Sequence, residues 1–558
     1  MKKFLALILA LVMCFSLVAC GGDKAEENKP AEESKQPAAS QGAVSKPEEV
    51  APADPEKEYK KEFIIANSMN FSAWDPVRDT SANYIWMYNL VYDSLLFQDL
   101  ETGEYLPRLA TEWEFSEKNT VLTLKLRNDA YFSNGEQFDA DDVVFTLERM
   151  HAFPDKTVPK MFADVEKVEV VDQFTVKYIL KSPNPDFLCT LAQPYNVMMN
   201  RDAFSKDPAT GEYDWEWPEV NTTRIEDGNN GRLIGTGLYV YEDFVDNDYA
   251  SVVKRTDGKY WGEDNPTERF IFRTIPEASA RLLALEAGEV DYVFSVSADD
   301  KAFVEDNDDL VLVSGGRTGI HYMAFNYSNG AAGAPYGDQN FRLAFTKALN
   351  REELSLAMYA GLAKPAYSSY SQYQFGYASQ EQVHGYDPEA AKEYLAKSSY
   401  NGEEIVIATT PSYKNMALTM CDQLRKIGIN ASVRDENATT IWTTLKNEEQ
   451  DAHIYNINMN PNGDDMRRFL TTSGGIPAID VNPLKDQLWE LFDKALATEG
   501  DAEREEIYAE IQRLVAEDCY LLPLIVPGAI DAQSANVEGT YWRANTVFDF
   551  RQARAVVD

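Results

Sequence analysis

Residues 121–143 read VLTLKLRNDAYFSNGEQFDADDV, and within them the residue pattern changes from strand-like to helix-like. Apolar and polar residues alternate through 121–127, as they do in a strand with one buried face. Residues 138–150 then follow a helical pattern. Asp139 suits the N-cap position of this helix, and Asp142 places a carboxylate in the first turn, where the helix dipole favours negative charge. The stretch predicts a strand that leads into a helix.

The same alternation of strands and helices continues outward along the chain. Strand, helix, strand, helix and strand patterns follow one another at 404–410, 413–427, 429–434, 438–447 and 452–457. Residues 165–180 predict a hairpin, residues 84–97 are apolar at helical spacing, and 482–498 and 501–518 predict two successive helices. This order predicts an α/β fold.

The N-terminus has the parts of a secretion signal in their usual order. Met1-Lys2-Lys3 is positively charged, and residues 4–17 form an apolar run that is too short to span a membrane comfortably. Residues 17–20 read LVAC, which is similar to a bacterial lipobox. We therefore expect a lipoprotein signal peptide at 1–19, a lipid on Cys20, and an extracytoplasmic protein anchored to the bacterial cell membrane.

The segment that follows Cys20 is predicted to be a disordered tether. Residues 20–58 are rich in Ala, Glu, Lys, Pro and Ser, and no aromatic residue occurs there before Tyr59. Such a composition buries too little apolar surface to offset the entropy lost on ordering. We expect the globular body to begin near residue 60.

Composition limits the classes of partner. The chain has 558 residues, enough for several domains, and a formal net charge of −39. This charge argues against binding to nucleic acid, because phosphate recognition needs clustered basic residues. The five cysteines are too few for a disulfide framework. Cys189, Cys421 and Cys519 are expected to be buried free thiols, with one bridge among them as the alternative.

No catalytic or metal-binding motif stands out. The sequence contains no GxSxG, GxxxxGK[ST] or HExxH motif, and the four histidines share no metal-ligand spacing. We therefore expect no catalytic residue, no metal and no cofactor, and predict that the protein is not an enzyme. A pair of carboxylates for glycoside hydrolysis stays open as an alternative, because 91 acidic residues always contain some pair.

Aromatic residues are interleaved with polar ones at 368–375, which reads SSYSQYQF. One interpretation is ordinary packing in the core and at the surface. The other is a binding cleft, in which rigid aromatic faces and a few polar groups line a pocket.

Several segments, in this order, resemble the extracellular solute-binding proteins of ABC importers, in the family 5 branch that binds oligopeptides, dipeptides and nickel. Besides residues 126–143, the resemblance rests on LPRLATEW at 106–113, GTGLY at 235–239, FRLAFTKALNR at 341–351 and YDPEAA at 386–391. The segments span most of residues 60–530.

The resemblance implies a two-lobed, type II periplasmic-binding-protein-like fold with an extra domain inserted in lobe 1. By this analogy the inserted domain comprises 98–221 and lobe 2 comprises 304–526, so that hinge crossings lie near residues 303 and 526. Lobe 1 is assembled from three segments: 60–97, 222–303 and 527–558.

The resemblance also implies which residues face the ligand. In lobe 1 these are Thr80, Ser81 and Tyr84, which follow the first strand. In lobe 2 they are Tyr413 and four residues of the loop after strand 452–457: Asn458, Asn460, Asp464 and Asp465.

Two departures from the family's pattern bear on the ligand. Asn460 occupies the position where many relatives carry an aspartate that pairs with the peptide amino group, although Asp464 or Asp465 could supply that charge. The arginine of dipeptide-type relatives is missing near 409–413, and Lys414 is a poorer partner for a carboxylate. These departures favour a longer peptide held by its backbone, or a neutral ligand such as an oligosaccharide.

The predicted function is therefore ligand capture and delivery to ABC permease subunits by a monomeric lipoprotein, with an oligopeptide as the expected ligand. The alternatives are a carrier of a non-peptide ligand, a peptide-sensing receptor and, least favoured, a surface hydrolase.

Overall fold

The computed structural model describes most of the chain after residue 51. The described residues are 52–71, 75–78, 82–99, 102–204, 206, 208–213, 215, 233–313, 315, 318–325, 335–437, 440–441, 452–471, 484–528, 530–543 and 547–557. The expected signal peptide, Cys20 and most of the tether lie outside them, as do Thr80, Ser81 and the predicted helix at 438–447 except for its residues 440–441.

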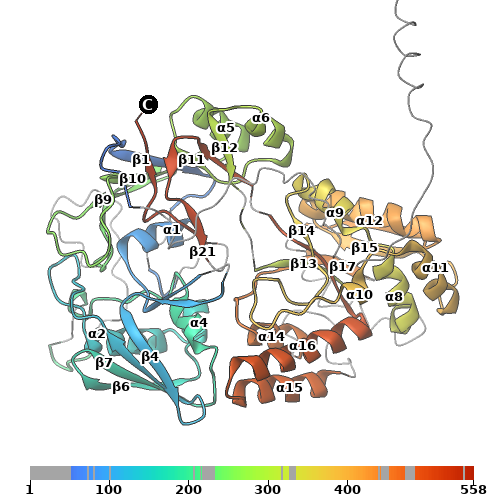
Figure 1. Ribbon diagram of the computed structural model, residues 1–558, viewed down its shortest axis with the longest axis horizontal. Coiled ribbons are helices and arrows are strands. Elements are labelled where there is room, and N and C mark those ends of the chain that lie inside the picture. The colour runs from blue at the N-terminus through green and yellow to red at the C-terminus, as the bar shows by residue number, and fades with distance from the viewer. Residues whose placement is uncertain are drawn as a thin grey trace, which may run out of the picture. The chain divides into compact units, whose positions relative to one another are not determined.

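A seven-stranded sheet is built from widely separated parts of the chain (Figure 1). Its central strand, β1, is parallel to both of its neighbours, β10 and β11, whereas the outer strands pair antiparallel. β1 supplies the buried side chains Phe63, Ile65 and Ala66, as expected for a strand covered on both faces. In spatial order the strands are β12 (Leu310–Val313), β19 (Asp531–Ser534), β11 (Tyr292–Val293), β1 (Glu62–Asn67), β10 (Arg269–Thr274), β9 (Tyr249–Lys254) and β8 (Tyr239–Val245).

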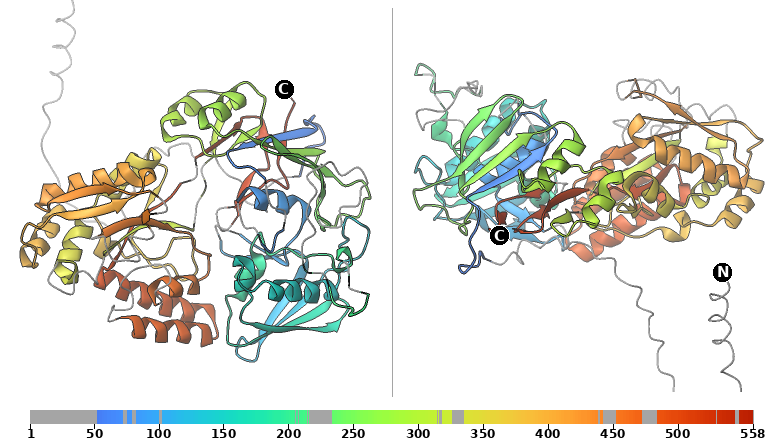
Figure 2. Two further views of the ribbon diagram at one scale, coloured as in Figure 1. Left: turned by 180° about the vertical axis from the view of Figure 1, so that it is seen from behind. Right: turned by 90° about the horizontal axis from the view of Figure 1, so that it is seen from above.

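A second sheet has six strands. β13 lies inside it, is buried along its whole length, and pairs antiparallel with β17 and β18. β15 is parallel to β16, and helix α12 (Lys414–Ile427) connects them as a crossover, ending at Gly428 with a positive φ of 100°. In spatial order the strands are β14 (Lys364–Pro365), β18 (Leu521–Val526), β13 (Ile320–Phe325), β17 (Ala452–Ile457), β15 (Ile405–Thr409) and β16 (Ala431–Asp435). Figure 2 shows from two further sides that these strands and those of the first sheet lie in separate parts of the molecule.

A four-stranded antiparallel sheet lies between β1 and β8 in chain order. Its strands, in spatial order, are β4 (Ala110–Ser116), β5 (Val121–Leu126), β7 (Thr175–Leu180) and β6 (Val165–Asp172). The strand and hairpin predicted at 121–127 and 165–180 are confirmed.

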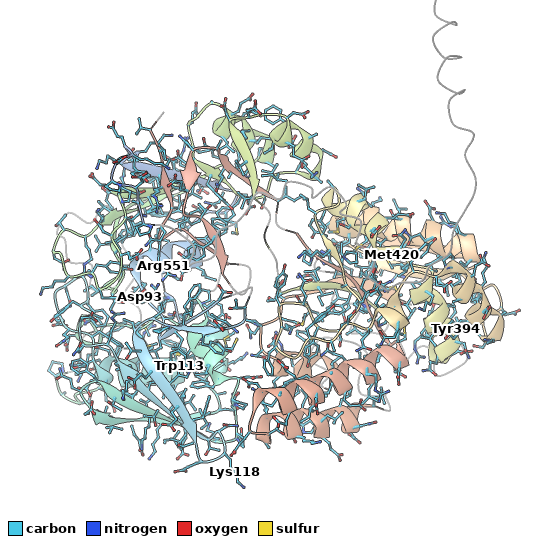
Figure 3. The ribbon with its side chains drawn as sticks, viewed as in Figure 1. Asp93, Trp113, Lys118, Tyr394, Met420 and Arg551 are labelled. Atoms are coloured by element: carbon cyan, nitrogen blue, oxygen red, sulfur yellow. The ribbon has the colours of Figure 1, made fainter. Side chains whose placement is uncertain are left out.

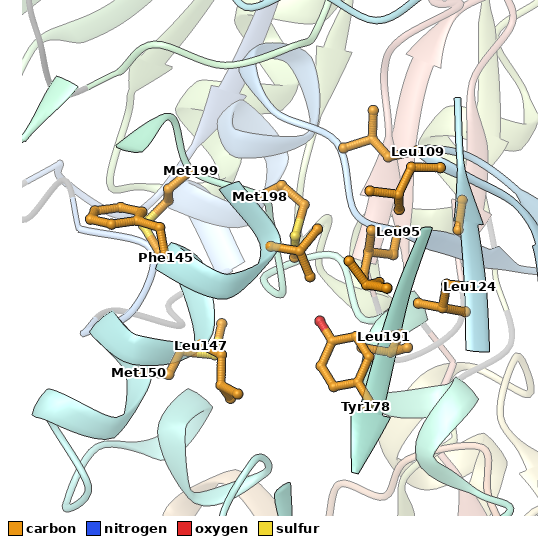
Figure 4. Close-up of a cluster of buried hydrophobic side chains, with 14 of the residues drawn as sticks. Leu95, Leu109, Leu124, Phe145, Leu147, Met150, Tyr178, Leu191, Met198 and Met199 are labelled. Carbon is orange, nitrogen blue, oxygen red and sulfur yellow. The ribbon is translucent and has the colours of Figure 1, made fainter. Parts of the chain in front are cut away.

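Helix α2 (Ala140–Ala152) packs against this sheet. The predicted N-terminus of the helix is confirmed. The Asp139 side chain accepts a hydrogen bond from the first turn, and the Asp142 side chain accepts one from the Asp139 backbone N–H. Figure 4 shows part of the buried cluster that α2 and the sheet share, with Phe145, Leu147 and Met150 from the helix and Leu124 and Tyr178 from the strands.

The predicted helix at 84–97 is too long. Helix α1 ends at Val91, and the chain continues into β2 (Leu96–Gln98), which pairs with β3 (Tyr105–Pro107). Gly237 approaches the end of α1 closely, and its N–H donates to the Val91 carbonyl at 2.9 Å. A tertiary contact therefore takes up a carbonyl at the end of the helix, which the apolar spacing could not reveal.

Asp93 lies two residues after the end of α1 and is buried (Figure 3). Its carboxylate accepts hydrogen bonds from the Thr236 hydroxyl and the Trp261 indole N–H, both at 3.0 Å, and pairs with the Arg108 guanidinium. A buried carboxylate needs such partners. The network fixes the chain where it turns from α1 toward the four-stranded sheet.

The chain passes between the first and second sheets twice. β12 ends at Val313 in the first sheet and β13 begins at Ile320 in the second, and the return lies between Val526 of β18 and Asp531 of β19. The first sheet thus includes a strand beyond residue 303, where we placed the end of its segment. The division into lobes and an inserted domain stays a prediction.

The remaining elements are mostly helices and short strands. The helices are α3 (Thr157–Lys160), α4 (Phe187–Ala192), α5 (Ala278–Glu286), α6 (Lys301–Glu305), α8 (Gln339–Lys347), α9 (Arg351–Tyr359), α10 (Glu381–His384), α11 (Pro388–Lys397), α14 (Arg467–Leu470), α15 (Lys485–Ala497) and α16 (Asp501–Asp518), and α1 begins at Ala82. The short strands are β20 (Val537–Glu538), β21 (Tyr541–Arg543), β22 (Val547–Asp549) and β23 (Arg554–Ala555). Within the part of the chain that the structure describes, no helix has the length and apolar character needed to cross a bilayer.

Candidate ligand-binding site

A cavity of about 1310 Å³ opens beside the start of helix α16, and we call it the α16 cavity. One wall comes from the region of the four-stranded sheet, through residues 98–119 and 185–188. The other comes from the region of the second sheet, through residues 372–377, 461–462 and 498–509. Pockets for drug-sized ligands reach about 1,000 Å³, so this cavity has room for a larger molecule.

The first wall presents aromatic side chains. Trp113 and Phe115 lie two positions apart on β4, so both point to the same face of the sheet. Both are half-buried, whereas the residues between and beside them are exposed. Trp113 is labelled in Figure 3. The alternation of the strand therefore places two ring surfaces in the cavity.

The second wall is formed by two loops that are bonded to each other. The Phe375 N–H donates to the Pro461 carbonyl at 2.7 Å, and the Gln374 side chain donates to the carbonyls of Asn460 and Asn462 at 3.2 and 3.4 Å. A Cβ at Gly463 would lie 2.4 Å from the Tyr508 ring, so only glycine permits this approach to α16. The loops thus form one rigid surface.

An ion pair joins the two walls. Asp186, just before α4, pairs with Arg504 of α16, and both side chains are less than 10% exposed, at 8% and 6%. The same carboxylate accepts the Asp464 N–H at 3.2 Å, and the Tyr508 hydroxyl lies 3.5 Å away. Arg504 also stacks over the Phe375 ring at 4.7 Å. This pair is the polar link across the cavity.

The structure places the predicted residue Tyr413 away from the α16 cavity. Tyr413 lies in a short 3-10 turn, Pro411–Tyr413, and its ring is 5.0 Å from that of His321. The side chain of Tyr84, like Thr80 and Ser81, lies outside the described residues.

The predicted loop residues lie together but are not among the residues that line the cavity. Asn460 donates its backbone and side-chain N–H groups to Asp465, at 2.9 and 3.3 Å. Asn458 is exposed and accepts from Asn456 at 2.7 Å. Asp465 also pairs with Arg468 at 3.3 Å. Their neighbours Pro461 and Asn462 line the cavity instead. The role of the predicted residues stays untested.

Asp464 has an unusual titration. It pairs with Arg467 at 3.0 Å, and 27% of its side-chain surface is exposed. The surrounding protein nevertheless desolvates the carboxyl group and raises its pKa to about 7, with the Asp186 carboxylate adding to the rise and Arg467 opposing it.

Sequence reasoning found part of the cavity and missed part. In the aromatic and polar run at 368–375, Tyr370 and the serines are buried, as the packing interpretation expects, while residues 372–375 line the cavity, where a binding role stays a prediction. Asp186 and Arg504 are 318 residues apart, and no sequence signal joins them.

The described residues offer contacts for a ligand but no cluster of side chains suited to hold a metal ion. No group of three or more His, Cys, Asp or Glu side chains among them could hold a metal ion. Cys189, Cys421 and Cys519 are free and buried, which confirms the expectation for these thiols. Burial raises the pKa of Cys189 and of Cys519 to about 12, so neither is a ready nucleophile.

Comparison with known proteins identifies the family. Residues 104–476 match the bacterial extracellular solute-binding proteins, family 5. The chain belongs to this family. Among curated family 5 relatives, it is 23% identical to di/tripeptide-binding protein 2 of Pseudomonas aeruginosa (strain UCBPP-PA14) over 526 residues, covering 88% of this chain and 95% of the relative. It is 26% identical to the glutathione-binding protein GsiB of Salmonella paratyphi A over 525 residues, covering 88% and 94%.

A solved structure gives the fold of this family 5 protein. The ABC transporter substrate-binding protein CtaP from Listeria monocytogenes superposes with a TM-score of 0.74 at 21% identity, covering 88% of this chain and 99% of that one. The chain therefore has the two-lobed type II periplasmic-binding-protein fold, as predicted from the sequence. The family also confirms that the protein binds a solute.

Proposed function

We propose that this family 5 protein captures an oligopeptide in the α16 cavity and delivers it to the membrane subunits of an ABC importer. The observation that carries the proposal is the pair of facing walls, which are distant in sequence and joined by Asp186 and Arg504. A peptide lying between them contacts both. The names of two relatives, which bind di- and tripeptides and glutathione, support a peptide ligand.

Binding proceeds without a chemical step. The cavity wall supplies ring faces and an exposed side-chain amide, Gln372, which suit a ligand held along its backbone. The protein accordingly acts as a carrier rather than an enzyme.

Capture is completed by hinge motion about the two crossings of the chain, between β12 and β13 and between β18 and β19. Hinge closure around a ligand is the usual motion of periplasmic binding proteins. Because Asp186 and Arg504 belong to opposite walls, opening separates them and returns both charges to water. Closure then restores the pair.

The sequence-predicted contacts complete the proposal. Thr80, Ser81, Tyr84 and Tyr413, with the loop at 458–465, are the proposed contacts of a peptide that extends beyond the α16 cavity, because Tyr413 lies away from the cavity and only Pro461 and Asn462 of the loop line it. A lipid on Cys20 holds the monomeric protein at the cell membrane, within reach of the permease.

Native mass spectrometry of the full chain, purified gently from cells in mild detergent, tests this function. The expected result is a set of adducts that fragment as peptides, and a rise in thermal stability when the same peptides are added back. An adduct that fragments as a glycan, or a bare mass with no thermal shift in a peptide mixture, would contradict it.

A further inference from the structure

The lining of the α16 cavity carries an excess of negative charge. Of its described lining residues, five are acidic and one, Arg504, is basic. The acidic residues are Glu104, Asp186, Asp501, Glu505 and Glu506. Arg504 is engaged by Asp186 and, at 3.2 Å, by Asp501. Its charge is therefore neutralised within the wall.

The remaining three carboxylates have no counter-charge among the described residues. Glu104 lies on the first wall, and Glu505 and Glu506 lie on the first turns of α16, all three exposed. Lys364 touches the lining from outside, where its Nζ donates to the Tyr373 hydroxyl at 3.2 Å, so one exposed cation stands against three exposed carboxylates. The potential in the cavity is negative.

A second, independent feature calls for a hydrogen-bond donor. Gln98 lines the cavity but is only 5% exposed, and its Nε2 donates to the Gly103 carbonyl at 3.2 Å. That bond fixes the amide, and Oε1 has no partner among the described residues. A buried acceptor without a donor is costly, so a ligand N–H that reached this oxygen would remove that cost.

The aromatic faces complete the pattern. Trp113, Phe115, Tyr105 and Tyr377 line the same cavity, and a cation over such a ring is attracted by its negative face. Carboxylates, a free acceptor and aromatic faces together suit an ammonium or guanidinium group.

We propose that the α16 cavity selects peptides that carry a lysine or arginine side chain over peptides that carry an acidic one. This inference rests on the proposed function and names the class of peptide. It concerns residues of both walls and does not depend on which group binds the peptide termini.

Three tripeptides that differ at one position test the selection: Ala-Lys-Ala, Ala-Gln-Ala and Ala-Glu-Ala, titrated calorimetrically into the purified full chain. We expect Ala-Lys-Ala to bind about tenfold more tightly than Ala-Glu-Ala at low salt, and the ratio to shrink as salt is raised. The Glu505→Gln, Glu506→Gln double variant should lower the ratio several-fold.

A matched control removes the same charge elsewhere. Glu503 and Glu490 are exposed acids on α16 and α15 that do not line the cavity, so the Glu503→Gln, Glu490→Gln variant should keep the ratio of the unmodified protein. Equal affinities, a preference for Ala-Glu-Ala, or equal effects of the two double variants would overturn the selection and leave peptide binding intact. No binding of any peptide in this series or in a random peptide mixture would overturn both.

Discussion

Two buried aspartate–arginine pairs use the same chemistry in different surroundings. Asp75 and Arg149 join the loop after β1 to helix α2 by two hydrogen bonds, at 2.8 and 2.7 Å. Asp186 and Arg504 join the loop before α4 to helix α16. The first guanidinium is completely buried and lies over the rings of Phe153 and Phe204, whereas the second lies on the wall of an open cavity.

This difference separates a permanent contact from a reversible one. A buried charge that loses its partner is penalised heavily unless water can reach it. Water cannot reach Arg149 without unfolding, but it reaches Arg504 as soon as the walls of the cavity separate. The first pair should therefore govern stability, and the second should govern the balance of open and closed forms.

The largest expected effect is on stability. Replacing Asp75 by Ala removes the carboxylate that pairs with the buried Arg149 guanidinium, which should lower the free energy of unfolding by about 3–5 kcal/mol. Urea denaturation followed by circular dichroism measures it. The control Asp422→Ala removes an exposed partner of Arg425, in a pair whose side chains are 71% and 50% exposed, and should cost less than about 1 kcal/mol. Equal losses would show that the buried pair has no special role.

The second pair should affect shape and affinity more than stability. In the Asp186→Ala variant the closed form loses its link, so we expect a larger radius of gyration by X-ray scattering and peptide affinity about five- to tenfold weaker. Asp501 provides the control, because it also bonds Arg504 at 3.2 Å but from the same helix. If Asp501→Ala expands the protein as much as Asp186→Ala does, the link across the cavity is not what holds it closed.

A buried carboxyl group near the Asp75–Arg149 pair should make the stability of the protein depend on pH. Asp142 lies on the same helix as Arg149 and is 2% exposed, and burial raises its pKa to about 7, against the opposing backbone N–H bonds from Arg201 and Asp139. Since the unfolded pKa is about 3.9, the folded state binds the proton more tightly, and stability from this group is lost as pH rises from about 4 to 7.

The Asp142→Asn variant lacks this titration. Its free energy of unfolding should therefore rise relative to that of the unmodified protein by up to about 1.4 kcal/mol per pH unit between pH 4 and 7. Denaturant unfolding at pH 4.5, 5.5 and 6.5 measures the difference. A difference that stays constant across these values would show that Asp142 is ionised throughout.

The ionisation of Asp464 should give the smallest effect. It should change the balance between open and closed forms rather than the free energy of unfolding. The Asp464 pKa of about 7 is raised by desolvation and by Asp186 in the closed arrangement, so closure becomes less favourable as pH rises through about 7 and the carboxyl group ionises. Because 27% of its side-chain surface is exposed, we expect less than about 1 kcal/mol. Scattering at pH 6 and pH 8 should show slight expansion of the unmodified protein and none of Asp464→Asn. If the unmodified protein and the Asp464→Asn variant expand equally, the expansion is caused by the titration of another group.

The sequence predicted local structure best where the signals were local. The capping box at Asp139 and the hairpin at 165–180 depend on neighbours in the chain, and both were confirmed. The end of α1 was wrong because it depends on Gly237, 146 residues beyond Val91.

The site was less accessible to sequence reasoning for the same reason. The loop after β17 was expected to carry the binding groups, yet Pro461 and Asn462 line the cavity, while Asn460 is bonded inside the loop to Asp465. Loop conformation decides which of several adjacent polar residues faces a ligand. The link from Asp186 to Arg504 follows only from the tertiary fold.

The central claim is that a peptide lies between the two walls of the α16 cavity. Hydrogen–deuterium exchange of the full chain, with and without the peptide that mass spectrometry identifies, tests it most directly. The account predicts slower exchange on both walls, at residues 102–116 and at 371–377 and 498–509. Protection confined to one wall, or located wholly outside these segments, would contradict it.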